Sequence, residues 1–141
     1  MLSGRPSGEV TALQAALAAE HAAVYGYGVV GAMLTGAAQA DARADWIAHQ
    51  VARDTLAAML TRLGATPVAA SPAYGLPFPV TGAASAEKLA AVLENGVTRA
   101  YLGLVAAGDP ALRSFAAQAM QASANRAAAW SGSTVAFPGM P

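Results

Sequence analysis

The stretch ATPVAASPAYGLPFPVTGAA, residues 65–84, decides how the rest of the chain is arranged. It contains four prolines. Proline inside a helix removes a hydrogen bond and clashes with the preceding turn, so the stretch is expected to be extended. Twenty extended residues reach about 60 Å, which is more than the length of a helix of similar size. We therefore expect a connection that runs the whole length of a helical bundle; the other reading is a merely flexible linker.

The residues on either side of this connection read as four helices. Ser7, Ser85 and Asp109 stand where helix N-caps are expected, and glycines at positions 36, 64 and 108 stand where helices end. The expected helices span about residues 7–34, 40–63, 85–107 and 110–130. Short turns make the first and second helices antiparallel, and likewise the third and fourth. The long connection makes the third helix parallel to the second. The predicted fold class is all-α, a ferritin-like four-helix bundle with one long crossover between the second and third helices.

Composition limits the classes of function. The 141 residues suit one domain covering residues 1–141, and eight basic against eight acidic side chains leave no net charge and no basic stripe for nucleic acid. Without cysteine there is neither a disulfide framework nor a thiolate metal site. The uncharged residues 22–40 approach the length of a membrane span, but they are mainly Ala and Gly and lack flanking Lys or Arg. We expect an alanine-rich cytoplasmic protein with no membrane helix.

Each helix carries at least one charged or ionisable side chain on the row that should turn inward. Glu20 lies in the inward row of the first helix, and Glu94 lies on one of two apolar faces of the third. His49 and Arg53 interrupt the leucine row of the second helix, and Arg126 lies on the row of the fourth. These residues are the candidates for a buried polar network.

The spacing of these residues favours ion pairs over a metal site. A ferritin-like metal site takes one Glu from each of two helices and a Glu-x-x-His from each of the other two. Glu20 and Glu94 suit the single glutamates, but arginines follow them at similar separations, at positions 53 and 126. If the first turn is centred near residue 38, Arg53 lies closer to the level of Glu20 than His49 does. We therefore predict Glu20 paired with Arg53 and Glu94 with Arg126, with no metal, no cofactor and no catalytic residue.

Several readings of single residues stay open. Glu20 can instead turn toward a wet groove, and His49 can be a satisfied core histidine or a metal ligand. Asp54 can be a second partner of Arg53 or a surface acid. The resulting candidate network is Glu20, His49, Arg53, Asp54, Glu94 and Arg126.

Five stretches together resemble a family of ferritin-like domains of unknown function from high-GC bacteria. They are AAEHAAVYGYG at 18–28, HQVARD at 49–54, LPFPVT at 76–81, LAAVLENGVTRAY at 89–101 and the closing RAAAWSG with FPG at 126–139. The resemblance implies a ferritin-like bundle over the whole chain and implies no established reaction. The chain contains no Glu-x-x-His, and this departure from metal-binding ferritin-like proteins argues against oxidase, ferroxidase and peroxidase activity.

Three hypotheses for function follow. The first is a non-catalytic structural or binding module, expected to be a homodimer because its helices are so apolar. The second is a degenerate or mononuclear metal site built from Glu20, His49 and either Glu94 or Asp54. The third is a small-molecule carrier with a pocket in the bundle core, in which Arg53 or Arg126 recognises a carboxylate. The aromatic side chains expected to line that pocket are Tyr27, Trp46, Tyr101 and Trp130. The apolar tail, about residues 131–141, is expected to fold back on the bundle or to dock on a neighbour.

Overall fold

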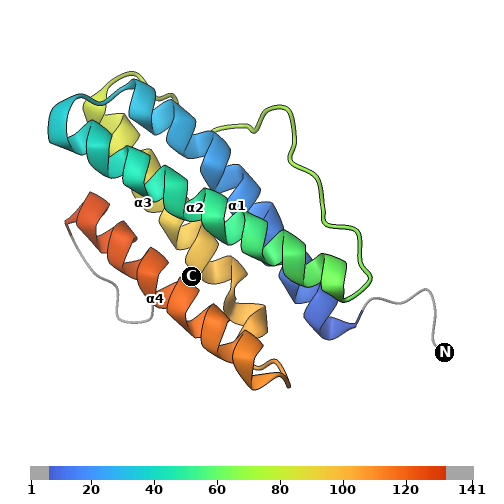
Figure 1. Cartoon of the computed structure of the whole chain (residues 1–141). Helices are drawn as coiled ribbons and strands as arrows, with labels where there is room; N and C mark the ends of the chain where they lie inside the picture. The colour runs from blue at the N-terminus through green and yellow to red at the C-terminus, as the bar shows by residue number, and fades with distance from the viewer. Residues whose placement is uncertain (1–6, 133–141) are drawn as a thin grey trace.

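The computed structural model describes residues 7–132, which form four long helices and one short 3₁₀ turn (Figure 1). The elements are α1 (Gly8–Ala32), α2 (Gly36–Arg62), α3 (Ala83–Ala100), η1 (Leu102–Leu104) and α4 (Pro110–Ser131). The described part of the chain contains no strand, so the all-α prediction is confirmed. None of these helices is both long and apolar enough to cross a bilayer. Most of the tail, residues 133–141, lies outside the described residues.

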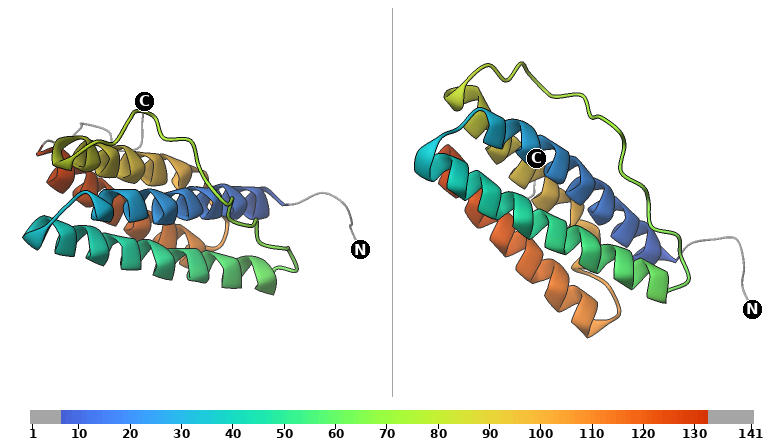
Figure 2. Two further views of the ribbon diagram at one scale, coloured as in Figure 1. Left: turned by 90° about the horizontal axis from the view of Figure 1, so that it is seen from above. Right: turned by 45° about the horizontal axis from the view of Figure 1, so that its top comes forward.

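The connection between α2 and α3 follows the length of the bundle, as Figures 1 and 2 show in three views. α1 and α2 are antiparallel, α3 and α4 are antiparallel, and α3 runs parallel to α2 (Figure 2). The predicted one-crossover topology is therefore confirmed. The four prolines explain why this connection adds no helix of its own.

Side chains of α1 hold the crossover in place, so it is more than a flexible linker. The side chain of Gln14 donates to the carbonyl of Thr66 at 2.7 Å and accepts from the backbone N–H of Val68 at 2.8 Å. His21 Nε2 lies 2.9 Å from the carbonyl oxygen of the same Val68. Farther along, the rings of Tyr25 and Tyr74 lie 5.4 Å apart. The connection between α2 and α3 thus packs along the outward face of α1.

The helix ends show which capping predictions were right. Ser7 caps α1 through a hydrogen bond from the Val10 N–H at 3.1 Å, and Asp109 caps α4 through one from the Ala111 N–H at 3.0 Å. The cap predicted at Ser85 is wrong, because α3 begins at Ala83 and the hydroxyl of Ser85 accepts the backbone N–H groups of residues 81 and 82 from inside the first turn. α3 ends earlier than predicted, and η1 follows it.

The first turn is also shorter and earlier than predicted. α2 begins at Gly36, whose φ of +59° suits glycine, so only residues 33–35 separate it from α1. The turn is therefore centred on residue 34 rather than 38. An earlier turn centre moves every residue of α2 relative to α1, and this shift changes which side chains face Glu20.

Two apolar clusters fill the bundle, one toward each end. One contains Leu13, Leu17, Leu56, Leu60, Tyr101 and Leu104, and the other contains Tyr27, Val30, Leu34, Leu89 and Ala90. Glu20, His49 and Glu94 lie near the middle of α1, α2 and α3, close to the boundary between the two clusters. The bundle thus places its ionisable groups at mid-height, where they are farthest from water.

Candidate functional site: a histidine between two glutamates

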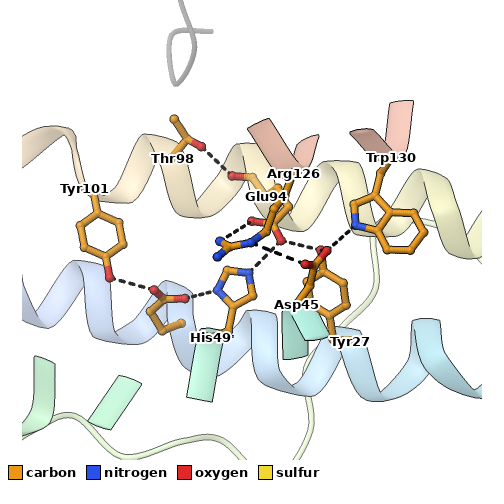
Figure 3. A network of polar contacts seen from close by, with 9 residues as sticks. Tyr27, Asp45, His49, Glu94, Thr98, Tyr101, Arg126 and Trp130 are labelled. Atoms are coloured by element: carbon orange, nitrogen blue, oxygen red, sulfur yellow. Dashed lines mark hydrogen bonds and ion pairs between the residues drawn. The ribbon is translucent and has the colours of Figure 1, made fainter. Parts of the chain in front are cut away.

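Three helices each contribute one fully buried ionisable side chain to the middle of the bundle. Glu20 comes from α1, His49 from α2 and Glu94 from α3, with exposed fractions of 2%, 1% and 0%. An isolated carboxylate at such a depth is strongly disfavoured, so each of these groups needs partners of opposite charge or hydrogen-bond donors. Figure 3 shows how this requirement is met.

His49 lies between the two glutamates and contacts one with each ring nitrogen. Nδ1 is 2.5 Å from Glu20 Oε1, and Nε2 is 2.8 Å from Glu94 Oε2. A neutral imidazole has one N–H and one lone pair, so it would turn a lone pair toward one of the carboxylates. A protonated imidazole donates to both, and this is the form that the geometry favours.

The pKa of His49 also indicates that its imidazole is protonated. Burial alone would lower the pKa of His49, but the hydrogen bonds to Glu20 and Glu94 and the charges of both carboxylates outweigh it and raise the pKa to about 9. His49 is therefore a cation at neutral pH. It balances one of the two negative charges of the site.

Two tyrosines complete the hydrogen bonds of the glutamates in a crossed arrangement. Tyr101, the residue directly after α3, donates to Glu20 Oε2 at 2.8 Å, and Tyr27 of α1 donates to Glu94 Oε2 at 2.5 Å. Burial, reinforced by the neighbouring carboxylates, raises the pKa of both phenols, so they remain neutral donors. Each tyrosine follows the glutamate of its own helix by seven residues and donates to the glutamate of the other helix. Each of these two segments thus contributes one glutamate and one tyrosine to the site, with the same spacing.

A third carboxylate, from α2, joins the network at its edge. Asp45 lies one helical turn before His49 and accepts from the indole N–H of Trp130 on α4 at 2.9 Å and from Tyr27 at 3.4 Å (Figure 3). Burial raises the pKa of Asp45, and the hydrogen bond from Trp130 partly offsets the rise. Asp45 and Trp130 thereby link α2 to α4 at one end of the network.

Arg126 of α4 contributes the second cation. Its Nη1 is 3.8 Å from Glu94 Oε1, and its Nε is 3.6 Å from Asp45 Oδ1. Both distances are those of ion pairs and exceed hydrogen-bonding range. Glu94 Oε1 is buried without a hydrogen-bond partner. The predicted pairing of Glu94 with Arg126 is therefore present as a loose contact.

The predicted pairing of Glu20 with Arg53 is wrong. Arg53 donates to the adjacent Asp54 at 3.0 Å, and their side chains are 30% and 72% exposed, so neither belongs to the buried network. The error lies in the centre of the first turn. With that centre at residue 34, the position level with residue 20 is twice 34 minus 20, or 48, which brings His49 rather than Arg53 next to Glu20.

The residues of the site do not suit a di-metal centre. Within residues 7–132 no group of three or more His, Cys, Asp or Glu side chains is arranged to hold a metal ion. Both nitrogens of His49 face carboxylate oxygens, so the imidazole has no lone pair to offer, and Arg126 cannot act as a ligand at all. The imidazole lies where a shared metal ion would have to contact both glutamates.

Sequence reasoning missed four participants in this site. Tyr27, Tyr101 and Trp130 were expected to line a cavity, and they are instead donors to carboxylates; Asp45 was not considered. Two signals were available in the sequence. Glu-x₆-Tyr occurs in both α1 and α3, and Asp45 precedes His49 by four residues, which places both on one helix face.

Residues 12–141 match the model of a family described as a domain of unknown function, DUF4439. The chain belongs to this family. Among solved structures, it is similar to the crystal structure of a conserved hypothetical protein, rv2844, from Mycobacterium tuberculosis, with a TM-score of 0.87 and 35% sequence identity. The similarity covers 92% of this chain and 98% of that one. No curated protein matches the chain.

Membership of the DUF4439 family agrees with the resemblance seen in the sequence. The similarity to the mycobacterial structure extends over nearly the whole length of both chains, so it includes the crossover and all four helices. The family description names no reaction, ligand or partner. The functional argument therefore rests on the geometry of the site.

Proposed function

We propose that this chain is a metal-independent, non-catalytic bundle of ferritin-like origin that works as a binding module. One observation carries the proposal: His49 contacts Glu20 through one ring nitrogen and Glu94 through the other. In a ferritin-like metal site these glutamates would be ligands. Here a protonated side chain of the protein itself supplies the positive charge that a metal would bring.

Charge accounting within the site supports the same conclusion. Glu20 and Glu94 carry two negative charges, and His49 and Arg126 carry two positive charges. The positive charges of His49 and Arg126 thus match the negative charges of the two glutamates without an added ion, and Asp45 at the edge of the layer adds one further negative charge. A divalent metal entering it would first have to displace the proton of His49 and then face the guanidinium of Arg126, and both steps oppose binding.

Metal loading tests this proposal directly. The purified protein is incubated with Fe(II), Mn(II) or Zn(II), freed of weakly bound metal by desalting, and analysed for metal content. We expect far less than one metal ion per chain. One tightly held ion per chain, lost in a Glu20→Gln variant, would contradict the proposal and favour the degenerate metal site.

A companion variant tests whether the choice of side chains at the site prevents metal binding. The substitutions Trp46→Glu, Ser123→Glu and Arg126→His would place Glu-x-x-His on both α2 and α4, at positions 46 and 49 and at 123 and 126. His49 and Ser123 are both buried and line the same cavity as Glu20. We expect this variant to gain metal binding that the unmodified chain lacks.

The homodimer predicted from the sequence remains part of the proposal. Ile47 and Val51 lie one turn apart on α2, and they are 43% and 61% exposed. Neighbouring exposed aliphatic side chains favour self-association. Light scattering on the purified chain tests this, with a dimer expected for the wild type and a monomer for Val51→Glu.

A further inference from the structure

The gap between α2 and α4 is the most open part of the bundle. α1 packs against α2 and α3, and α3 packs against α4, whereas the backbones of α2 and α4 stay farther apart within the described residues and are bridged by side chains such as Trp130 with Asp45. Two cavities open along this gap, of about 780 and 240 Å³. The smaller one reaches down to Glu20 and His49. The smaller cavity therefore borders the polar layer, although Glu20 and His49 themselves are almost fully buried.

Arg126 lies where the two cavities meet, since it lines both. Figure 3 shows its guanidinium between Glu94 and Asp45. The two ion pairs, at 3.8 and 3.6 Å, are its polar contacts with other residues of 7–132, and no hydrogen bond of the described residues uses its N–H groups. A guanidinium has five N–H donors in a planar fork that matches a carboxylate. Two acids thus orient the guanidinium of Arg126, while its N–H groups are left to donate hydrogen bonds to a ligand.

The charges around the two cavities differ. The larger cavity is lined by Asp41, Asp45 and Glu87 together with Arg126, so its excess charge is negative. The smaller cavity has Arg126 and the protonated His49 in its lining, with Glu20 as the one carboxylate among its lining residues, while Glu94 contacts both cations from outside the lining. An anion therefore meets fewer carboxylates when it reaches Arg126 from the side of the smaller cavity.

The smaller cavity also limits the kind of anion. Its other lining residues include the ring of Phe115, the amide of Gln118 and the hydroxyl of Ser123. An apolar body can pack on Phe115, while polar groups near Arg126 meet the charged end. Glu94 and Asp45 stand within 4 Å of the guanidinium, and their repulsion disfavours a doubly charged anion such as phosphate.

We propose that Arg126 binds the carboxylate of a small monocarboxylic acid in the cavity between α2 and α4. This inference rests on the proposed function, because it names the ligand class of the binding module. The carboxylate accepts two N–H groups of Arg126, and the remainder of the acid lies against Phe115.

Calorimetric titration with benzoate and two analogues tests this inference. Benzamide has the same shape without the charge, and inorganic phosphate has the charge without the apolar body. We expect benzoate to bind the wild type in the millimolar range or tighter, and both analogues to bind at least about tenfold more weakly, because charge-assisted hydrogen bonds contribute most of the difference. Equal binding of benzamide, or tighter binding of phosphate, would overturn the assignment.

Two variants and a control locate the site. Arg126→Gln is expected to lose benzoate binding by at least about tenfold. Arg126→Lys keeps the positive charge but loses the planar guanidinium, so it should also bind benzoate more weakly than the wild type. It replaces Arg126→Gln in the test if that variant folds poorly. Arg99→Gln removes an exposed arginine of α3 and should bind benzoate as the wild type does. Unchanged benzoate affinity in a folded Arg126 variant would overturn the inference.

The two proposals fail separately. A tightly bound metal would end the metal-independent proposal without affecting the benzoate titration. Binding of benzamide as strong as that of benzoate would leave a binding module but would remove carboxylate recognition by Arg126. Failure of benzoate to bind the wild type at all would overturn the inference and leave the metal analysis to decide the proposed function.

Discussion

Tyr101 Oη lies 2.8 Å from Glu20 Oε2, so the C-terminal cap of α3 supplies a donor to the buried carboxylate of α1. Tyr27 and Glu94 repeat the contact in the opposite direction at 2.5 Å. The two contacts differ in one respect. Glu94 Oε2 also faces His49, whereas Glu20 Oε2 has Tyr101 as its hydrogen-bond donor within the described residues.

This difference predicts unequal costs for removing the two phenols. Tyr101→Phe leaves a buried carboxylate oxygen without a donor, and we expect it to lower the free energy of unfolding by about 2 to 3 kcal/mol. Tyr27→Phe should cost less, because Glu94 Oε2 keeps His49. Urea denaturation measures both, with Tyr25→Phe as the control on the crossover side of α1. A larger loss for Tyr27→Phe than for Tyr101→Phe would contradict the account.

Removing the central cation should be more costly than removing either phenol. His49→Gln leaves Glu20 and Glu94 facing an uncharged side chain in a buried layer, and we expect a loss of about 3 to 5 kcal/mol at pH 7. Arg53→Ala is the matched control. It removes an exposed pair with Asp54, so a loss below about 1 kcal/mol is expected. Equal denaturation midpoints for the two variants would argue against the central role of His49.

The protonation of His49 predicts how stability changes with pH. The pKa of His49 rises from 6.5 to about 9 on folding, so the folded chain holds this proton more tightly than the unfolded chain. The resulting stabilisation is complete below pH 6.5 and is lost as the pH rises through 9. Its size is about 3 kcal/mol. Denaturation series between pH 6 and 10 measure the decline, and His49→Gln should lose this component; a wild type with constant stability over that range would disagree.

Two glycines of α1 predict opposite effects of an added methyl group. A Cβ at Gly26 would lie 2.5 Å from Leu93 Cδ1, because α1 and α3 approach closely there. Gly26→Ala should therefore destabilise the bundle by about 1 to 3 kcal/mol. A Cβ at Gly28 meets nothing within 4 Å, so Gly28→Ala should stabilise it by about 0.5 to 1 kcal/mol through helix propensity. Thermal melts compare the two, and a stabilising Gly26→Ala would refute the close packing.

The fold was predictable from the sequence because its determinants are local. Prolines in residues 65–84 forbid a helix there, and the caps at Ser7 and Asp109 mark helix starts by their own side chains. The ends of the third helix were harder to predict. Its N-cap, Gly82, has no side chain that marks a helix start, and η1 replaces the last turns that were expected. The order and direction of the helices could therefore be predicted from composition, whereas the exact ends of the helices could not.

The site was less predictable because it depends on register between helices. A turn misplaced by four residues moves the facing residue by eight, which exchanged His49 for Arg53 as the partner of Glu20. The inward row of α4 was also misjudged. Arg126 was expected on that row, but its side chain is 26% exposed, whereas Ala116, Ser123 and Ala127 are buried. Small residues on every face of this helix leave no hydrophobic contrast to identify the buried one.

The central claim is that His49 is a cation held between Glu20 and Glu94. Nitrogen-15 NMR of the imidazole rings, followed from pH 5 to 10, measures its protonation directly, with His21 as the internal comparison. We predict that both ring nitrogens of His49 carry protons at pH 7 and that the ring titrates near pH 9. A neutral His49 at pH 7, or a ring nitrogen shifted by a bound metal, would contradict the account.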